Sequence, residues 1–297
     1  MSRELPFSNK MLRLGLTLAG GLGLLEGAAI MGSQRQNPVP LDIIADKYSG
    51  DQTFITDGNF FVDITLHPQT EMGAVQIPNT NDIVYIYTGN SKALELKRRT
   101  IFSQKEQTLT TFNDSDYPQL WVEDLQADPS GQYVSYILSS GDNLGRIMRS
   151  SLTDGTMEQI TPDGLTVYRH IWSPDGQTIV FSGWMSGEAR LYTLNPKSGG
   201  LQILASGGEQ IAEQTFSPDG TKVAFTWIEE HTSDIYVVDL QDFTLQKFKL
   251  EADQLMFAPR WESDRSISFS FVDRTTYAEK QITRSIADLM PVINPDG

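Results

Sequence analysis

The side chains best suited to catalysis are scarce in this chain. There are three histidines, His67, His170 and His231, and no cysteine. The lack of cysteine excludes disulfides, thiolate nucleophiles and cysteine-bound zinc. His170 comes shortly before the turn sequence WSPDG, whereas His231 falls in a loop expected at the opposite end of the strands. At roughly 3.3 Å per residue along a strand, these two imidazoles are not expected to share a ligand.

Carboxylates are plentiful but follow no catalytic pattern. The chain has neither the G-x-S-x-G motif of serine hydrolases nor the H-E-x-x-H motif of zinc peptidases. The nearest match to a calcium loop, NDSDYP at residues 113–118, lacks the glycine and the distal glutamate. We therefore predict no metal site, no cofactor and no catalytic residues. A pair of carboxylates for glycoside chemistry stays open, because such a pair is formed in space and not in sequence.

The charge balance limits the partners. With 23 Lys and Arg against 38 Asp and Glu, the formal net charge is −15. This charge repels nucleic acid phosphates and anionic lipid surfaces, so we expect no nucleic acid partner. A diffuse excess of acid is also typical of ordinary solubility.

A repeated phrase organises the second half of the chain. DPSGQYVSYI, SPDGQTIVFS, SPDGTKVAFT and ESDRSISFSF place Gly131, Gly176, Gly220 and Arg265 at intervals of 45, 44 and 45 residues. An apolar stretch precedes each phrase, and β-branched and aromatic residues follow it, which is typical of strands. Two further strand-like segments complete each unit. Four short strands per repeat predict the blades of a β-propeller.

The SPDG phrase has a physical role as a turn between two strands. Proline fixes φ near −65°, aspartate tolerates the next position, and glycine takes the left-handed conformation that closes the turn. We therefore predict that Ser173, Asp175, Ser217 and Asp219 hold the geometry of the turn and do no chemistry.

These residues carry a resemblance to a known family. WSPDG…IVFSG…LYTLN and FSPDG…VAFTW…IYVVDL resemble the repeats of TolB-like propellers, which are also called PD40 or WD40-like repeats. The likeness is strong over residues 120–293 and weak over 39–112. In the weaker part, 82–88 and 107–112 are expected to be strands, and 54–68 a hairpin. The predicted fold is an all-β propeller of four-stranded antiparallel blades, five readable and a sixth partial.

The resemblance implies a periplasmic protein-binding platform. TolB proteins carry an α/β domain before the propeller, and the stretch before the first blade is too short for one here. The expectation is therefore a relative that has only the propeller, and membership of a Tol–Pal complex is not assumed.

The first residues have the layout of an export signal. Arg3, Lys10 and Arg13 precede the uncharged apolar run 14–25. Extending the run to Met31 approaches the length of a membrane span, so cleaved signal and retained anchor both stay open. We predict a signal peptide or anchor helix at 1–33, a linker at 34–40 and the propeller at 41–297. Either way the body of the protein would be exported, to a periplasm or a thylakoid-lumen-like compartment.

The predicted strand order gathers two sets of candidate site residues. Asp124, Arg169 and Glu213 fall at matching repeat positions on the innermost strands and are candidates for lining the channel. Trp184 and Trp227 either pack between blades, the favoured interpretation, or contact a partner. An acidic rim for partner binding is predicted where the second-to-third loops meet the blade crossings, from Asp142, Glu188, Glu209, Glu229, Glu230, Asp234, Glu251 and Asp253.

The sequence thus favours an exported, non-catalytic propeller that binds or assembles proteins, with membrane contact through the N-terminal segment if it is uncleaved. The alternative is a propeller lyase or hydrolase that acts on carbohydrates or glycans. A sensor of a small ligand or cation is a third hypothesis.

Overall fold

The structure is a computed structural model, and its described residues all lie within one compact unit, Asn37–Gly297. They are 42–46, 52–56, 61–63, 74–88, 93–101, 105–112, 120–141, 144–230, 232–248, 254–273, 276 and 278–292. The predicted export segment 1–33 and linker 34–40 lie outside them. So do NDSDYP at 113–118 and the residues His67, His231, Asp142, Glu251 and Asp253.

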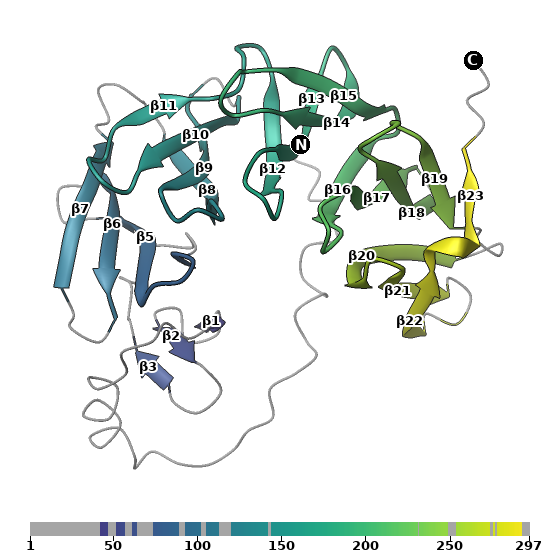
Figure 1. The fold of residues 1–297 in the computed structure, drawn as a ribbon, viewed down its shortest axis with the longest axis horizontal. Coiled ribbons are helices and arrows are strands. Elements are labelled where there is room, and N and C mark those ends of the chain that lie inside the picture. Colours follow the sequence, from purple (N-terminus) through teal and green to yellow (C-terminus); the bar gives the residue numbers. More distant parts are fainter. Residues whose placement is uncertain are drawn as a thin grey trace, which may run out of the picture. The chain divides into compact units, whose positions relative to one another are not determined.

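The described residues form antiparallel sheets that follow one another in chain order (Figure 1). The first sheet has three strands, β1 (Asp42–Asp46), β2 (Gln52–Thr56) and β3 (Phe61–Asp63). β2 and β3 pair as a hairpin with Phe54 opposite Asp63, which confirms the hairpin predicted within 54–68.

Three separate four-stranded sheets come next. Their strands are β4 (Ala74–Gln76), β5 (Asp82–Thr88), β6 (Leu94–Thr100) and β7 (Lys105–Phe112); β8 (Trp121–Ala127), β9 (Tyr133–Ser139), β10 (Arg146–Ser151) and β11 (Met157–Gln159); and β12 (Thr166–Trp172), β13 (Ile179–Met185), β14 (Glu188–Leu194) and β15 (Leu201–Ser206). The strands predicted at 82–88 and 107–112 are present, as β5 and within β7.

The remaining strands form two blade-like groups within one eight-stranded sheet, in which a single parallel pairing, Ser233 opposite Leu255, joins the groups. They are β16 (Gln210–Phe216), β17 (Lys222–Glu229), β18 (Thr232–Asp239) and β19 (Leu245–Phe248), then β20 (Gln254–Ser263), β21 (Ser266–Asp273) and β22 (Glu279–Ser285). A 3-10 turn at Ile286–Asp288 leads to β23 (Leu289–Pro291), which pairs antiparallel with β19. The C-terminal strand therefore extends the preceding blade. The all-β class with four-stranded blades is confirmed.

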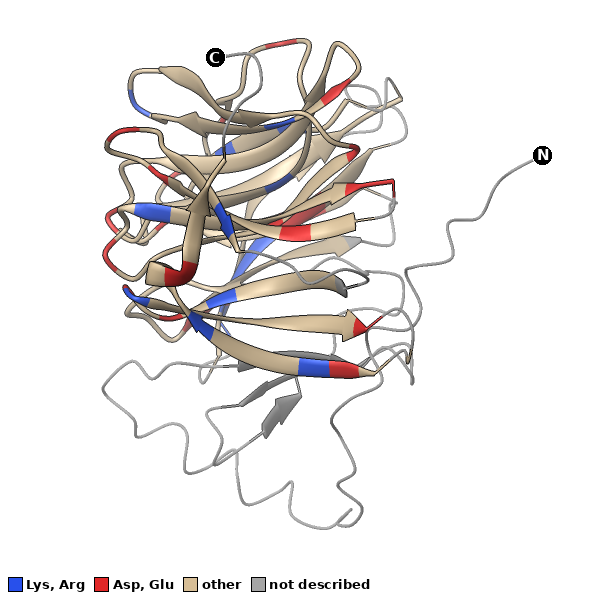
Figure 2. Ribbon diagram, turned by 90° about the vertical axis from the view of Figure 1, so that its right-hand side faces the viewer, with Lys and Arg blue, Asp and Glu red and all other residues tan. Residues whose placement is uncertain are grey.

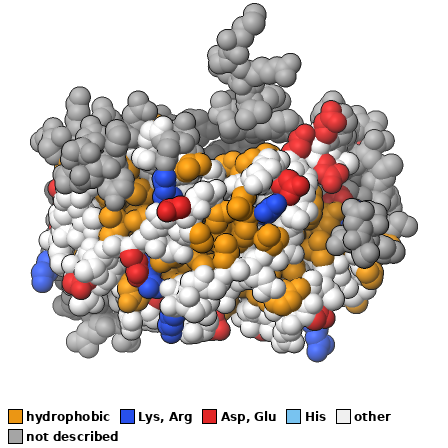
Figure 3. Space-filling model, turned by 90° about the horizontal axis from the view of Figure 1, so that it is seen from above, with side chains coloured by type: hydrophobic (Ala, Val, Ile, Leu, Met, Phe, Trp, Pro, Cys, Tyr) orange, Lys and Arg blue, Asp and Glu red, His pale blue; other side chains and the backbone are white. Residues whose placement is uncertain are grey.

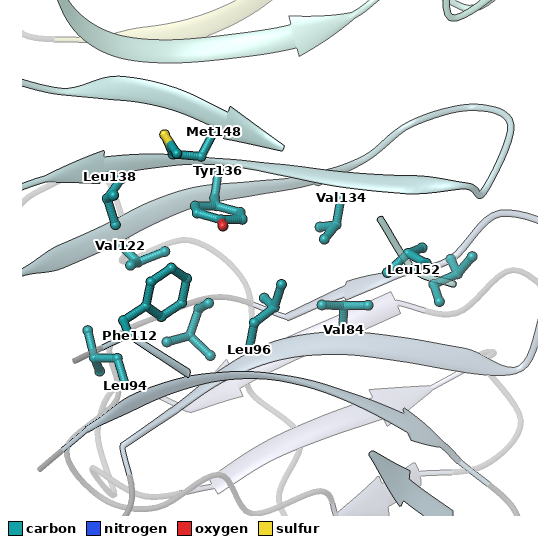
Figure 4. Close-up of a cluster of buried hydrophobic side chains, with 12 residues drawn as sticks. Val84, Leu94, Leu96, Phe112, Val122, Val134, Tyr136, Leu138, Met148 and Leu152 are labelled. Atoms are coloured by element: carbon teal, nitrogen blue, oxygen red, sulfur yellow. The ribbon is translucent and has the colours of Figure 1, made fainter. Parts of the chain in front are cut away.

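The core consists of apolar layers between successive sheets. In the layer shown in Figure 4, Val84 and Leu96 lie opposite Val134, and Phe112 meets Tyr136 edge-on with ring centroids 5.7 Å apart. These residues come from β5, β6, β7 and β9, so the layer joins two blades. Each blade that lies between two others has such a layer on both of its faces. This burial explains the long apolar runs in its central strands.

The two tryptophans singled out in the sequence pack into such a layer. Trp184 and Trp227 both contact the cluster between the β12–β15 and β16–β19 sheets. The Trp227 ring lies 4.8 Å from that of Tyr236, measured between centroids. The interpretation that they pack between blades is confirmed.

The SPDG turns form as predicted. Gly176 and Gly220 have φ of 67° and 72°, in the left-handed region. The Ser173 hydroxyl donates to Asp175 Oδ1 over 2.6 Å and accepts from the Thr178 amide over 3.0 Å. The hydrogen bond from Ser173, together with one from the Gln177 amide, holds the pKa of Asp175 below its ordinary value. The serine and aspartate of the turn therefore hold its geometry.

Turns of neighbouring blades are also stacked. A Cβ atom placed on Gly220 would lie 3.3 Å from Pro174 Cδ of the preceding blade, and one on Gly176 would lie 3.5 Å from Pro129 Cδ. The fourth phrase departs from this pattern. Ser263 pairs directly with Ser266, so the hairpin closes around a two-residue turn in which Arg265 has no left-handed φ.

We expect replacement of a residue between blades to cost far more stability than replacement of an exposed aromatic residue. Phe181 is fully buried and stacks on Tyr192 with centroids 4.9 Å apart, whereas Phe243 is 43% exposed. Phe181→Ala should lower the free energy of unfolding by about 3–5 kcal/mol, through lost burial and a cavity. Phe243→Ala should change it by less than about 0.5 kcal/mol. Urea unfolding of both variants measures this, and equal losses would contradict the layered core.

Candidate functional site

The innermost strands share an irregularity that recurs with the repeat. In β8, β12, β16 and β20 the register against the second strand shifts near Asp124, Arg169, Glu213 and Ala258. Asp124, Glu213 and Ala258 have φ between 51° and 56°, a region that residues other than glycine seldom adopt. Such β-bulges turn a side chain away from the regular alternation of a strand. Here they bring polar groups of neighbouring blades within hydrogen-bonding distance.

Hydrogen bonds at these bulges join each innermost strand to the next. Asp124 Oδ2 accepts from the His170 amide over 2.6 Å, and Glu213 Oε2 accepts from the Ala258 amide over 2.6 Å. Between them, Gln214 Nε2 donates to the carbonyl of Arg169 over 2.9 Å. We call these three contacts the inter-blade latches. They hold strained backbone in place, because each bulge is fixed by a group from the adjacent blade.

His170 sits at the centre of one latch. Its side chain is fully buried, with Nε2 2.6 Å from Ser135 Oγ and Nδ1 2.9 Å from Asp124 Oδ2. Trp172 Nε1 donates to the same serine oxygen over 2.8 Å. Aspartate, histidine and serine in this order resemble a hydrolase triad. Ser135 is fully buried and its oxygen is already occupied by the indole, so in this structure the group ties two blades together.

The environment of Asp124 favours its charged form. Burial by itself would raise the pKa of this carboxyl group. Hydrogen bonds and charge from His170, together with the positive charge of Arg169, outweigh burial and hold the pKa below its ordinary value.

A cavity of about 830 Å³ lies along the same innermost strands, toward the SPDG turns. Each of the five blade-like groups from β4 to β22 contributes to its wall. Its lining residues are Pro78, Gln126, Ala127, Pro129, Arg169, Ile171, Trp172, Ser173, Pro174, Glu213, Gln214, Thr215, Phe216, Ala258, Pro259 and Arg260. Two of the predicted channel residues, Arg169 and Glu213, therefore share this cavity. The third, Asp124, does not line it and instead accepts the His170 latch.

The charged groups of the cavity differ in how they are used. Arg169 and Arg260 are exposed. Glu213 is half-buried, and its Oε2 also accepts from the Thr226 hydroxyl over 2.7 Å. The sequence does not indicate a role for Arg260. The equivalent positions in the two preceding repeats hold Thr215 and Ile171, so no charged residue recurs there.

The described residues of the predicted acidic rim do not form one uniform group. Asp234 pairs with Lys247 at 2.9 Å and Glu188 with Arg190 at 3.1 Å, whereas Glu209, Glu229 and Glu230 are exposed near strand ends. Figure 2 shows acidic positions at both ends of the strands. Asp175, Asp219 and Asp242 lie in turns at the SPDG end. Negative charge is therefore not confined to the predicted rim.

The outer strands present a different surface. Leu201 and Ile203 on β15 are 37% and 47% exposed, and they lie two residues apart on one face of the strand. Figure 3, seen from the side on which β11 and β15 lie in Figure 1, shows hydrophobic side chains with charged ones scattered among them.

Two features are absent from the described residues. No three His, Asp or Glu side chains are grouped as metal ligands there. No helix in the described part of the chain is long and apolar enough to cross a membrane.

Comparison with known proteins supports the fold. No protein-family model matches the sequence. TolB from Acinetobacter baumannii is similar over 82% of this chain at 14% identity, with a TM-score of 0.52. The match covers 63% of that protein, so this chain spans less than two thirds of its length. The fold is that of a β-propeller.

Other propellers with this likeness are enzymes. An oligogalacturonate lyase in complex with manganese matches 79% of this chain and 73% of its own, at 13% identity and a TM-score of 0.52. Porphyromonas gingivalis dipeptidyl peptidase 4 matches 84% of this chain and 43% of its own, at 7% identity and a TM-score of 0.61. Identities this low show a shared fold and nothing about activity.

We expect the Asp124 latch to contribute stability that depends on pH. Because the folded pKa lies below the ordinary value of 3.8, the contribution is present above that pH and is lost as pH falls through the folded pKa. Asp124→Asn should lower the free energy of unfolding by about 1–3 kcal/mol at neutral pH. The difference in this free energy between the variant and the parent protein should shrink below pH ~4.

Denaturant unfolding from pH 7 to pH 2 measures this dependence. Asp163→Asn, in an exposed turn, serves as the control and should be nearly neutral. A gap between parent and Asp124→Asn that stays constant down to pH 2 would show that the latch does not act through charge.

Proposed function

We propose that this protein is a TolB-like, non-catalytic propeller that binds a protein partner, and that the partner docks in the cavity on the innermost strands. One observation carries the proposal: a cavity of about 830 Å³ lined by residues from five successive blades, with two exposed arginines in its wall. Its size is that of a site for a small molecule or a short peptide segment. A rigid wall lowers the entropic cost of binding, and the latches supply that rigidity.

Export is the second part of the proposal. The basic residues before the apolar run 14–25 support a periplasmic or equivalent lumenal location, with or without a retained anchor. The likeness to TolB agrees with this proposal. A place in a larger envelope complex would follow if the docked partner is itself a membrane protein.

A second candidate function is action on an acidic glycan, because Arg169 and Arg260 in the cavity wall can also pair with sugar carboxylates, and an oligogalacturonate lyase shares the fold. Incubation with oligogalacturonate and Mn²⁺, followed by chromatography of the sugar, tests it. Shortening of the substrate in proportion to added protein would make the chain an enzyme.

We expect a photo-reactive residue at the cavity to capture the partner. p-Benzoyl-phenylalanine would replace Pro174 at the cavity wall, Glu229 at the acidic end of the strands, or Phe243 in an exposed turn outside the lining. After irradiation of cells that make the full-length protein, mass spectrometry identifies the adducts. A single protein should be cross-linked in high yield from position 174 and not from position 243.

The three positions separate the alternatives. Capture from position 229 alone would place the partner at the acidic rim and contradict the cavity as the docking site. Equal capture from all three positions would indicate random collision. The absence of a protein adduct from any of them would contradict the binding function itself.

A further inference from the structure

We infer that the cavity recognises an acidic peptide segment, whose carboxylates pair with Arg169 and Arg260. This inference rests on the proposed function and names the chemistry of its partner. The two arginines come from β12 and β20, the innermost strands on either side of β16. They therefore approach the cavity from two different blades.

Neither guanidinium group is held by a direct contact within the described structure, although the positive charge of Arg169 also helps to lower the pKa of Asp124. No hydrogen bond from the Arg169 or Arg260 side chain, and no carboxylate within 4 Å of it, occurs among the described residues. Other arginines are neutralised locally, since Arg98 pairs with Asp82 and Arg149 with Glu158. Exposed arginines in a cavity are available to an incoming anion.

The charge of the lining is opposite to that of the chain. Arg169, Arg260 and Glu213 are the ionisable residues of the wall, which gives one net positive charge in a protein of net charge −15. The Glu213 carboxylate already accepts from Thr226 and Ala258. A concave, partly apolar wall focuses the field of the two arginines into the cavity and raises the local concentration of anions.

The remaining lining offers polar and apolar contacts that suit a peptide. A guanidinium group matches a carboxylate in a planar, bidentate contact, and Gln126 adds an amide that can bond to a peptide backbone. Ile171 and Phe216 offer apolar contacts between these polar groups. The most exposed aromatic side chains of the described residues, Trp121 and Tyr168, are not in the lining. The aromatic residues of the lining, Trp172 and Phe216, are only partly exposed, and the Trp172 indole nitrogen donates to Ser135.

Fluorescence anisotropy with fluorescein-labelled hexaglutamate tests the inference on the full-length protein. The parent protein should bind hexaglutamate and not hexaglutamine. Arg169→Gln and Arg260→Gln should each weaken binding about tenfold or more, because a hydrogen bond to a charged group contributes about 1.5–3 kcal/mol. Arg260→Lys should weaken it less, since it keeps the charge but loses the planar fork.

A matched control separates the cavity from general charge. Arg284 lies exposed on β22 and outside the lining, so Arg284→Gln removes the same charge elsewhere. It should leave the affinity for hexaglutamate unchanged. Equal losses in Arg284→Gln and the cavity variants, or equal binding of hexaglutamine, would overturn the inference. All variants should melt within a few degrees of the parent protein, because the replaced side chains are exposed.

Two outcomes distinguish this inference from the proposed function. If position 174 still captures a protein but hexaglutamate does not bind, the acidic-peptide inference fails and the binding function stands. If trigalacturonate binds at least tenfold more tightly than hexaglutamate, the ligand is an acidic glycan and the peptide assignment is wrong. If no protein is captured from the cavity, the proposed function fails first.

Discussion

The whole structure depends on one constraint: each four-stranded sheet has two apolar faces and can bury them only against neighbours. Val180 of β13 belongs to the layer with the following blade, whereas Ile179 and Phe181 of the same strand belong to the layer with the preceding one. Alternation along a strand therefore supplies two cores at once. An isolated blade would leave both of these faces in water, so the repeats stabilise one another.

This mutual burial fixes the central strands but leaves polar backbone at the innermost ones. There the chain adopts bulges, and left-handed φ values at Asp124 and Glu213 would be unfavourable in isolation. The latches compensate by giving the amides of His170 and Ala258 an acceptor from the previous blade. The cavity wall is formed by the same strands. Its geometry is therefore set by contacts between residues about one repeat apart.

Much of the fold could be predicted from sequence because its signals are local. The turn at Gly176 needs a residue with left-handed φ, and the SPDG phrase alone indicates it. β5 coincides with an apolar stretch of 82–88. The latches have no such signal, since Asp124 reaches His170 only after two blades have packed. The pairing of β23 with β19 is equally non-local, because a segment of three residues becomes a strand only by pairing with the edge of an existing sheet.

The site was predicted only in part, because the contacts between blades that decide the role of each residue have no local signal in the sequence. The spacing of Asp124, Arg169 and Glu213 correctly indicates equivalent places on the innermost strands, but equivalence of position does not give equivalence of role. Asp124 accepts from His170, Glu213 accepts from the Ala258 amide, and Arg169 forms no ion pair at contact distance among the described residues.

Burial decides these roles more than residue type does. Asp124, His170 and Ser135 have the composition of a catalytic triad, yet each polar atom that matters is taken by another blade. Arg169, the residue next to His170 in sequence, is exposed and belongs to the lining of the cavity, whereas His170 is buried. Adjacent residues on one bulged strand thus have different places in the structure: His170 joins two blades, whereas Arg169 lines the cavity.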